Sequence, residues 1–367
     1  MSGNDPKRKW ALPPSDPHPA RIQRARLDRY DALSSVGAVL KRRDFIVLAG
    51  GAAAGGPLTA RAQQPKRRIG VLMGYAENDQ EGQAFVAAFR EGLQKLGWAE
   101  GRNIRIETHW AAADVKTMQR FAKELVALQP DLILTQNTPT TAAMLQHTRT
   151  IPIIFANVAD PVGSGFVANF PRPGGNATGF TLYEPTMAGK WPGLLKEIAP
   201  RVARVAFLFN PATAPYVEYF MPPFKAAAAS LGVEAISAPV RDPSELESVV
   251  AALAREPNGG LIVMPDIFLT AYRVEIISQV ARYRVPAVYP WRLFAEVGGL
   301  LSYGNDQVDN YRRAATYADR MLKGAKPSEL PVQAPVKFEL VINLKTAKAL
   351  GLNVPLSLQQ RADEVIE

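Results

Sequence analysis

Residues 68–73 read RIGVLM, and residues 204–209 read RVAFLF. Each stretch is a short apolar run behind a single arginine, which is typical of a parallel β-strand buried on both faces. A helical pattern follows each run and ends at a Leu-Gly pair, at residues 96–97 and 231–232. Glycine commonly ends helices because it adopts left-handed backbone angles without strain. The two stretches therefore predict two copies of one strand–helix unit.

The repeat continues beyond the first unit. Residues 132–135 (LILT) correspond to residues 261–264 (LIVM), and an Ile-Pro or Val-Pro pair opens the next strand at residues 151–152 and 285–286. Strand and helix patterns alternate throughout both series. This order predicts an α/β fold with two similar doubly wound lobes, each a parallel sheet covered by helices on both faces.

The chain extends past the second series with a helical pattern, a proline-rich stretch and the strand-like segment FELVIN. We expect these tails to cross back between the lobes, which makes neither lobe contiguous. The link at residues 181–186 is expected to be a hinge strand. The predicted boundaries are residues 69–182 with 305–330 for the first lobe and 183–304 with 331–367 for the second.

The net charge of +9 lies at the amino-terminal end of the chain. Residues 1–68 hold 14 of the 43 basic and 5 of the 34 acidic residues, which leaves 29 of each in residues 69–367. The lobes are therefore neutral and lack the basic excess that nucleic-acid-binding proteins use. We expect no nucleic-acid partner.

The sequence also narrows the chemistry that is available. Absence of cysteine excludes disulfides, thiolate catalysis, thiolate metal sites and a lipid anchor on an amino-terminal cysteine. His109 and His147 are the only histidines after residue 62. A multi-histidine metal site is excluded, and a Ser-His-Asp triad has two candidate imidazoles at most. We expect no metal and no cofactor.

Residues 41–62 have the pattern of an export signal. Three basic residues precede a glycine- and alanine-rich apolar run, and Ala60-Arg61-Ala62 fits a cleavage site. Residues 42–46 (RRDFI) resemble the twin-arginine export motif, with an ordinary Sec signal as the alternative. We expect a periplasmic protein cleaved after about Ala62. Residues 1–40 read as a disordered extension or as sequence upstream of the true translation start.

Ligands of open α/β sheets bind beyond the carboxyl ends of the strands. In the first lobe, Asn137 or Thr138 caps a helix with Pro139 in its first turn, which suits a carboxylate, although simple capping is the alternative. Asp160 suits an ammonium group or a turn before a proline. The first-lobe candidates are Tyr75, Asn137, Thr138, Thr140, Asn157 and Asp160.

In the second lobe, one acid and several aromatic residues follow the predicted strands. An acid with aromatic rings suits a ligand that has an amino group and a flat apolar body. Packing under a loop is the alternative for each ring. The second-lobe candidates are Asn210, Asp266, Tyr289, Trp291 and Tyr303.

Four segments carry a family resemblance: ADPVGSGFV (159–167), RPGGNATGF (172–180), KFELVINLKTAKALGL (337–352) and LQQRADEVIE (358–367). Over about residues 41–367 the chain resembles the periplasmic substrate-binding proteins of ABC importers with the type I periplasmic-binding-protein fold. The group includes tryptophan and tyrosine receptors. The resemblance implies a small-molecule ligand held between the lobes, with an aromatic amino acid favoured, and an ABC permease in the membrane as partner.

The resemblance also implies roles for particular residues. Thr138 and Thr140 would hold the ligand carboxylate. Asp160 or Asp266 would meet the ammonium group, and Tyr75, Tyr289 or Trp291 would flank the side chain.

We expect a monomer that binds by hinge closure and catalyses no reaction. A periplasmic ligand sensor for a signalling partner is the main alternative. An enzyme on the same fold, with His109 as a general base, is a weaker one. A transcription factor of this fold would carry a helix-turn-helix segment ahead of the first lobe, where this chain has a leader.

Overall fold

The computed structural model describes residues 66–183 and 185–367. The predicted extension at residues 1–40 and the predicted export signal at residues 41–62 lie outside the described residues. The predicted lobe boundaries stay a prediction, although the chain forms two sheets with separate hydrophobic cores.

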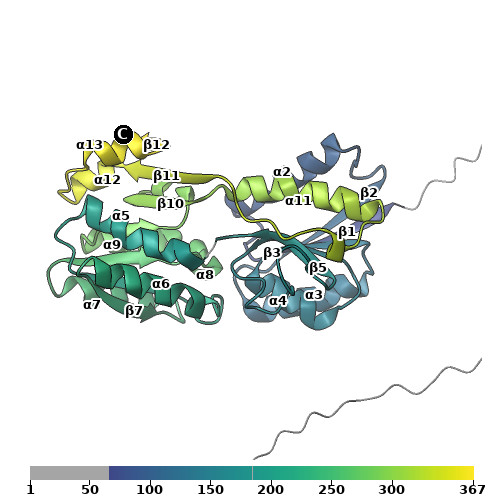
Figure 1. Ribbon diagram of the computed structural model, residues 1–367, viewed down its shortest axis with the longest axis horizontal. Helices are drawn as coiled ribbons and strands as arrows, with labels where there is room; N and C mark the ends of the chain where they lie inside the picture. Colours follow the sequence, from purple (N-terminus) through teal and green to yellow (C-terminus); the bar gives the residue numbers. More distant parts are fainter. Residues whose placement is uncertain (1–65, 184) are drawn as a thin grey trace, which may run out of the picture. The chain divides into compact units, whose positions relative to one another are not determined.

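The first sheet has five parallel strands in the order β2-β1-β3-β4-β5. Figure 1 shows α2 and α11 on one face of this sheet and α3 and α4 on the other. The strands are β1 (Arg67–Met73), β2 (Ile104–Trp110), β3 (Leu132–Asn137), β4 (Ile153–Val158) and β5 (Ala177–Thr181). The helices are α2 (Gln80–Lys95), α3 (Val115–Ala127), α4 (Thr138–His147) and α11 (Gln307–Leu322).

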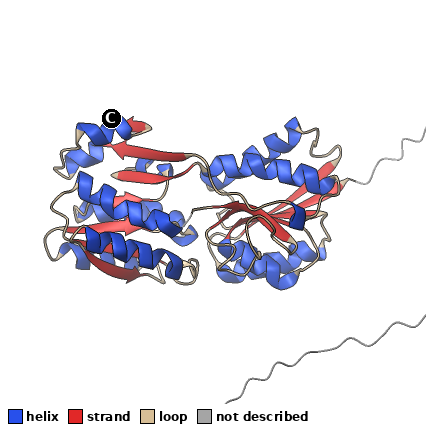
Figure 2. Ribbon diagram, in the orientation of Figure 1, coloured by secondary structure: helices blue, strands red, loops and turns tan. Residues whose placement is uncertain are grey.

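The second sheet has seven strands in the order β12-β11-β10-β9-β8-β6-β7, and helices cover it as well (Figure 2). The strands are β6 (Arg204–Phe209), β7 (Glu234–Pro239), β8 (Gly259–Val263), β9 (Ala287–Tyr289), β10 (Leu301–Asn305), β11 (Phe338–Asn343) and β12 (Glu364–Ile366). The α-helices are α5 (Lys190–Ile198), α6 (Val217–Ser230), α7 (Glu245–Ala254), α8 (Ile267–Ala271), α9 (Arg273–Arg282), α10 (Arg292–Glu296), α12 (Leu344–Ala349) and α13 (Leu356–Arg361). Two short 3-10 helices are η1 (Pro185–Gly189) and η2 (Pro327–Glu329).

The predicted two-lobed α/β fold is confirmed, and the second sheet departs from it in one respect. Strand β11 runs antiparallel to β10, and β12 pairs parallel with β11, so these two edge strands run against the other five. The chain leaves the second sheet at the carboxyl end of β10, forms α11 on the first sheet, and then returns. Because it re-enters from the carboxyl ends of the parallel strands, β11 has to run in the opposite direction.

Three connections join the two sheets within the described part of the chain: after β5, after β10, and between η2 and β11. The expected hinge strand at residues 181–186 is wrong, because β5 ends at Thr181 and η1 begins at Pro185. The third connection lies along β5. The backbone N–H of Gln333 donates to the carbonyl of Gly179 at 2.9 Å, and the N–H of Thr181 donates to the carbonyl of Gln333 at 2.9 Å.

The first two connections meet at Gly304. The Tyr183 hydroxyl donates to the carbonyl oxygen of Pro290, which follows β9, at 2.6 Å. A Cβ atom on Gly304 would overlap both that hydroxyl and that carbonyl oxygen. Position 304 therefore requires glycine for steric reasons.

We predict that Gly304→Ala lowers the free energy of unfolding by about 1–3 kcal/mol, the usual cost of overpacking. Gly193 in α5 is the matched control, because a Cβ there meets nothing within 4 Å. Gly193→Ala is expected to be neutral or to stabilise by about 0.5–1 kcal/mol, because alanine favours helix. Urea unfolding measures both variants, and equal effects of the two would contradict the steric account.

Candidate ligand site at the strand ends

The loop at the start of α4, predicted to bind a ligand carboxylate, forms a capping box for that helix. Asn137 Oδ1 accepts from the N–H of Thr140 at 3.0 Å, and the Thr140 hydroxyl accepts from the N–H of Asn137 at 2.9 Å. Pro139 has no N–H, so the first turn of α4 has little left to offer an anion. The exception is Thr138, whose hydroxyl accepts from the N–H of Ala159 at 3.1 Å and keeps its own proton to donate. The role expected for Thr140 is therefore corrected to capping.

Asn157 belongs to a buried amide network rather than to an open surface. Its Nδ2 donates to Gln307 Oε1 at 3.2 Å, and its Oδ1 accepts from Asn310 Nδ2 at 2.7 Å. Asn310 also donates to the carbonyl of Thr181 at 3.2 Å. The network ties β4 and the end of β5 to α11, so Asn157 stabilises the first lobe at the point where two connections leave and enter it.

Asp266 is the most strongly engaged acid of the second lobe. Its two oxygens accept from the N–H of Asn210 at 2.9 Å, the hydroxyl of Thr213 at 2.6 Å and the N–H of Phe268 at 2.9 Å. Only 1% of the residue is exposed, and burial raises its pKa to about 6 against these hydrogen bonds. Asn210 is also used for a local contact, because its Oδ1 accepts a hydrogen bond from the N–H of Ala212. Both residues join the ends of β6 and β8, and the ammonium role predicted for Asp266 is not supported.

Only one carboxylate oxygen of Asp160 accepts a hydrogen bond from the described residues. Its Oδ1 accepts from the N–H of Gly163 at 2.8 Å, as a turn residue does, and Oδ2 has no hydrogen-bond partner among the described residues. The carbonyl of Gly163 accepts from the Tyr219 hydroxyl at 3.1 Å. Since Tyr219 lies in α6, this contact joins the Asp160 turn to the second lobe.

The four predicted aromatic residues lie in different places. Tyr75 is 3% exposed and packs edge-on against Phe85. Tyr289 is 1% exposed and stacks on a phenylalanine inside the second core, and Tyr303 lines a cavity beside α5 and β11. The flanking role predicted for Tyr289 is wrong, because its ring lies in the core, and the candidate Tyr303 lines a different cavity. Trp291, 7% exposed, follows β9 and remains at the strand ends.

Two buried polar side chains at the strand ends have no partner among the described residues. They are Trp291, through Nε1, which lies beside the Tyr183 hydroxyl without a hydrogen bond of regular geometry, and Asn305, through both atoms of its amide. Strands β9 and β10 are parallel neighbours, so their carboxyl ends lie at the same edge of the sheet. Asn305 is only 6% exposed and was missed as a site residue, although it is the last residue of β10. Buried polar groups are rarely left unsatisfied, which marks this edge as a place for a ligand.

A second group of missed residues joins the lobes. Arg273 in α9 donates to Asp79 Oδ2 at 2.9 Å and to the carbonyl of Thr270 at 2.9 Å. The side chains of Arg273 and Asp79 are 17% and 11% exposed. Asp79 also caps α2 by accepting from the N–H of Glu81 at 2.9 Å. An aspartate before the helical pattern signalled the cap in the sequence, but nothing there indicated a partner 194 residues away.

Glu81 lies next to this ion pair, and its carboxylate has no hydrogen-bond partner among the described residues. Burial raises its pKa to about 7, helped by the negative charges of Glu296, Asp79 and Asp306 and opposed by Arg273. These neighbours come from both lobes. The carboxyl group therefore gains a proton, or a cation, more readily than an ordinary glutamate does.

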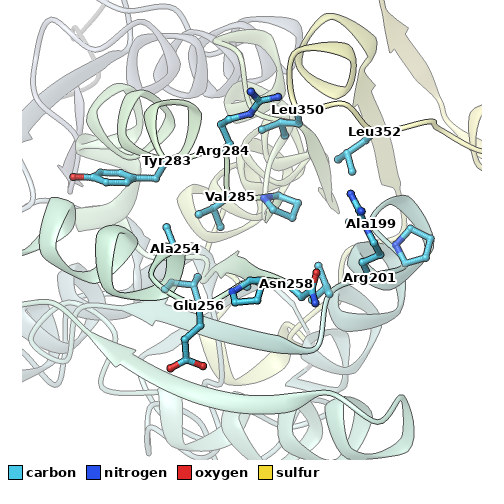
Figure 3. Close-up of a pocket in the computed structure, with 16 residues that line it drawn as sticks. Ala199, Arg201, Ala254, Glu256, Asn258, Tyr283, Arg284, Val285, Leu350 and Leu352 are labelled. Carbon is cyan, nitrogen blue, oxygen red and sulfur yellow. The ribbon is translucent and has the colours of Figure 1, made fainter.

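Other parts of the chain offer different surfaces. A cavity of about 260 Å³ is lined by residues that precede β6, β8 and β9. Among them are Arg201, Asn258 and Arg284, which Figure 3 labels. The cavity lies at the amino ends of these strands, opposite the edge that carries Trp291 and Asn305. The ring of His109 in β2 packs edge-on against Phe121, and His147 Nε2 at the end of α4 lies 3.2 Å from Gln119 Oε1, so both histidines contact α3 rather than the strand ends of the candidate site.

Residues 66–183 and 185–367 lack both a membrane-spanning helix and a cluster of metal-ligand residues. No helix there combines the length and apolar character needed to cross a membrane. No cluster of three or more potential metal ligands gathers there either.

Glu81 makes stability depend on pH. The folded-state pKa of about 7 exceeds the ordinary value of 4.5, so the folded protein binds the proton more tightly than the unfolded chain does. The resulting stabilisation is complete below about pH 4.5 and is lost as the pH rises through about 7. We predict that the midpoint temperature of unfolding decreases as the pH is raised from about 5 to about 8. Glu81→Gln should make this decrease smaller.

The matched control is Glu91→Gln, an exposed glutamate on the same helix. Differential scanning calorimetry across the pH series should show the wild-type slope in this control. An unchanged slope in Glu81→Gln would contradict the assignment.

Residues 78–366 match the family described as ABC transporter substrate binding protein. The chain is 26% identical over 265 residues to a tyrosine-binding protein of Clostridioides difficile (strain R20291), covering 72% of this chain and 75% of the relative. A Streptococcus pneumonia ABC domain solved in complex with L-Trp is 27% identical, with a TM-score of 0.75, and the match covers 82% of this chain and 100% of that one.

A conserved domain protein from Vibrio cholerae o1 biovar eltor is also 27% identical, with a TM-score of 0.76, covering 82% of this chain and 99% of that one. The family match spans both sheets and most of the described residues. The chain therefore belongs to the family of ABC transporter substrate-binding proteins.

Proposed function

We propose that this protein is the solute receptor of an ABC importer for an aromatic amino acid and that it catalyses no reaction. Membership of the family implies a small-molecule ligand and an ABC permease as partner, and substrate-binding proteins of this kind act outside the cytoplasm. The aromatic class is supported by two relatives, one named a tyrosine-binding protein and one solved with L-Trp.

The observation that carries the proposal is the pair of unsatisfied buried side chains at the ends of β9 and β10. Trp291 Nε1 donates only, whereas the Asn305 amide both donates and accepts. Leaving them buried without partners costs free energy, which a polar ligand would recover. A receptor that closes on a polar ligand accounts for this arrangement.

The remaining available groups suggest how a zwitterion would be met. The Thr138 hydroxyl proton is free for the ligand carboxylate. Asp160 Oδ2 or the Glu81 carboxylate, rather than Asp266, would take the ammonium group, because a buried charge requires a counter-charge. Tyr75 and Trp291 would flank the aromatic side chain.

Closure would use contacts between the lobes. The Arg273–Asp79 ion pair and the Tyr219–Gly163 hydrogen bond each join one lobe to the other. A ligand shifts such an equilibrium by the difference between its affinities for the closed and open forms. These contacts would add to the stability of the closed, ligand-bound form.

The remaining expectations concern the cell. We propose export to the periplasm with cleavage after about Ala62, without a lipid anchor, and a monomeric receptor.

We predict that isothermal titration calorimetry detects binding of L-tyrosine or L-tryptophan to the purified protein and no binding of L-aspartate or L-lysine. Trp291→Phe is expected to weaken binding by about tenfold or more, because it removes the indole N–H and keeps an aromatic ring. Trp98, whose Nε1 donates to Asp319 at 2.9 Å within the first lobe, provides the matched Trp98→Phe control. Absence of binding by every aromatic amino acid would overturn the proposal.

We also predict that Arg273→Gln weakens binding of the same ligand by about tenfold, or 1.4 kcal/mol, through a faster off-rate. The reason is that the variant removes a partly buried contact made only when the lobes meet. Arg282→Gln is the control, because Arg282 pairs with Glu247 inside the second lobe. Stopped-flow fluorescence measures both, and an unchanged off-rate in Arg273→Gln would contradict a role in closure.

A further inference from the structure

Ile267 is the first residue of α8 in the second lobe, yet its side chain packs in the core of the first lobe. It is 5% exposed and belongs to the hydrophobic core of the first sheet. The next two residues, Phe268 and Leu269, belong to the core of the second sheet. Between residues 185 and 304, all of which the structure describes, no other buried residue joins the first core. The contact that Ile267 makes therefore crosses from one lobe to the other.

Ile267 meets the first lobe at Gly74, the residue that follows β1. Its Cγ1 atom lies 3.1 Å from the position that a Cβ atom on Gly74 would take, so a side chain there would crowd the isoleucine. The Gly74 backbone is held in place, because its N–H donates to Gln136 Oε1 at 2.8 Å and its carbonyl accepts from the N–H of Ala113 at 2.6 Å. The isoleucine thus packs on a fixed surface.

The amino end of α8 is fixed as well. Asp266, the residue before Ile267, accepts three hydrogen bonds that tie this end of the helix to the ends of β6 and β8. Arg273, which pairs with Asp79 of the first lobe, also donates to the carbonyl of Thr270 in α8. The apolar contact of Ile267 and the ion pair of Arg273 therefore lie on one rigid edge of the second lobe.

The two contacts on this edge respond differently when the lobes separate. Arg273 and Asp79 regain water when they lose one another, which offsets much of the attraction between them. Ile267 would move from an apolar core into water, which the hydrophobic effect opposes. The isoleucine contact therefore favours closure of the lobes, and it does so without any contribution from a ligand.

We propose that Ile267 is an apolar latch that holds the lobes together, so that the free receptor already populates the closed form. The proposal rests on the closing receptor proposed above and adds to it a positioning residue that acts through closure rather than by touching the ligand. The apparent affinity of a ligand for the closed form scales with the fraction of receptor in that form. The latch would therefore raise affinity for every ligand of the cleft by the same factor.

The test measures the distance between the lobes in the ligand-free protein. The chain has no cysteine, so spin labels can be attached at Lys123→Cys on α3 and Ser248→Cys on α7, both exposed positions. Double electron–electron resonance should show two populations, one at the distance that the structure has. Ile267→Ala should lower the ratio of closed to open protein by about tenfold or more, because it removes three buried carbon atoms. Ile267→Val should have a smaller effect and serves as the conservative variant.

The matched control is Val274→Ala on α9, because Val274 is 65% exposed and its loss should leave the ratio unchanged. In the unlabelled Ile267 variants, the dissociation constant of L-tryptophan should rise with the loss of closed protein. A free wild-type protein with only the open distance, a wild-type ratio in Ile267→Ala, or an equal loss in Val274→Ala would overturn the latch. Because the distances are measured without ligand, failure to bind any aromatic amino acid would count against the proposed ligand and not against the latch.

Discussion

The steric contact at Gly304 fixes how the two sheets are joined. The Tyr183 hydroxyl and the Pro290 carbonyl occupy the space that a side chain at position 304 would need. The first two connections therefore come together beside the ends of β9 and β10, and the return of the chain as β11 starts from the carboxyl ends of the parallel strands. The antiparallel β11 follows from this connectivity.

Hydrogen bonds within each lobe use most of the polar groups at the strand ends. Asn157 and Asn310 bind one another, Asn137 and Thr140 cap α4, and Asp266 holds three donors. Each of these residues stabilises a strand end or a crossing. The few groups left over, above all Trp291 and Asn305, are the ones that a ligand would use. The proposed binding site thus uses polar residues other than those that stabilise the strand ends.

The sequence predicted the repeated units because RIGVLM and RVAFLF are buried on both faces, and apolar runs of that length have few other solutions. It also placed polar residues at the strand ends. It did not separate capping from binding, since both uses favour the same residue types at helix starts, as Asn137 and Thr140 illustrate. The Arg273–Asp79 pair and the orphaned Asn305 amide depend on tertiary contacts, for which a single sequence holds no signal. The direction of β11 was missed for the same reason.

The central claim is that the ligand completes the unsatisfied groups at the ends of β9 and β10. A crystal structure of the protein grown with L-tryptophan or L-tyrosine tests it most directly. The account predicts ligand density within hydrogen-bond distance of Trp291 Nε1 or the Asn305 amide, with Arg273 paired to Asp79 across the lobes. Ligand density elsewhere, with both side chains still unpartnered, would contradict it.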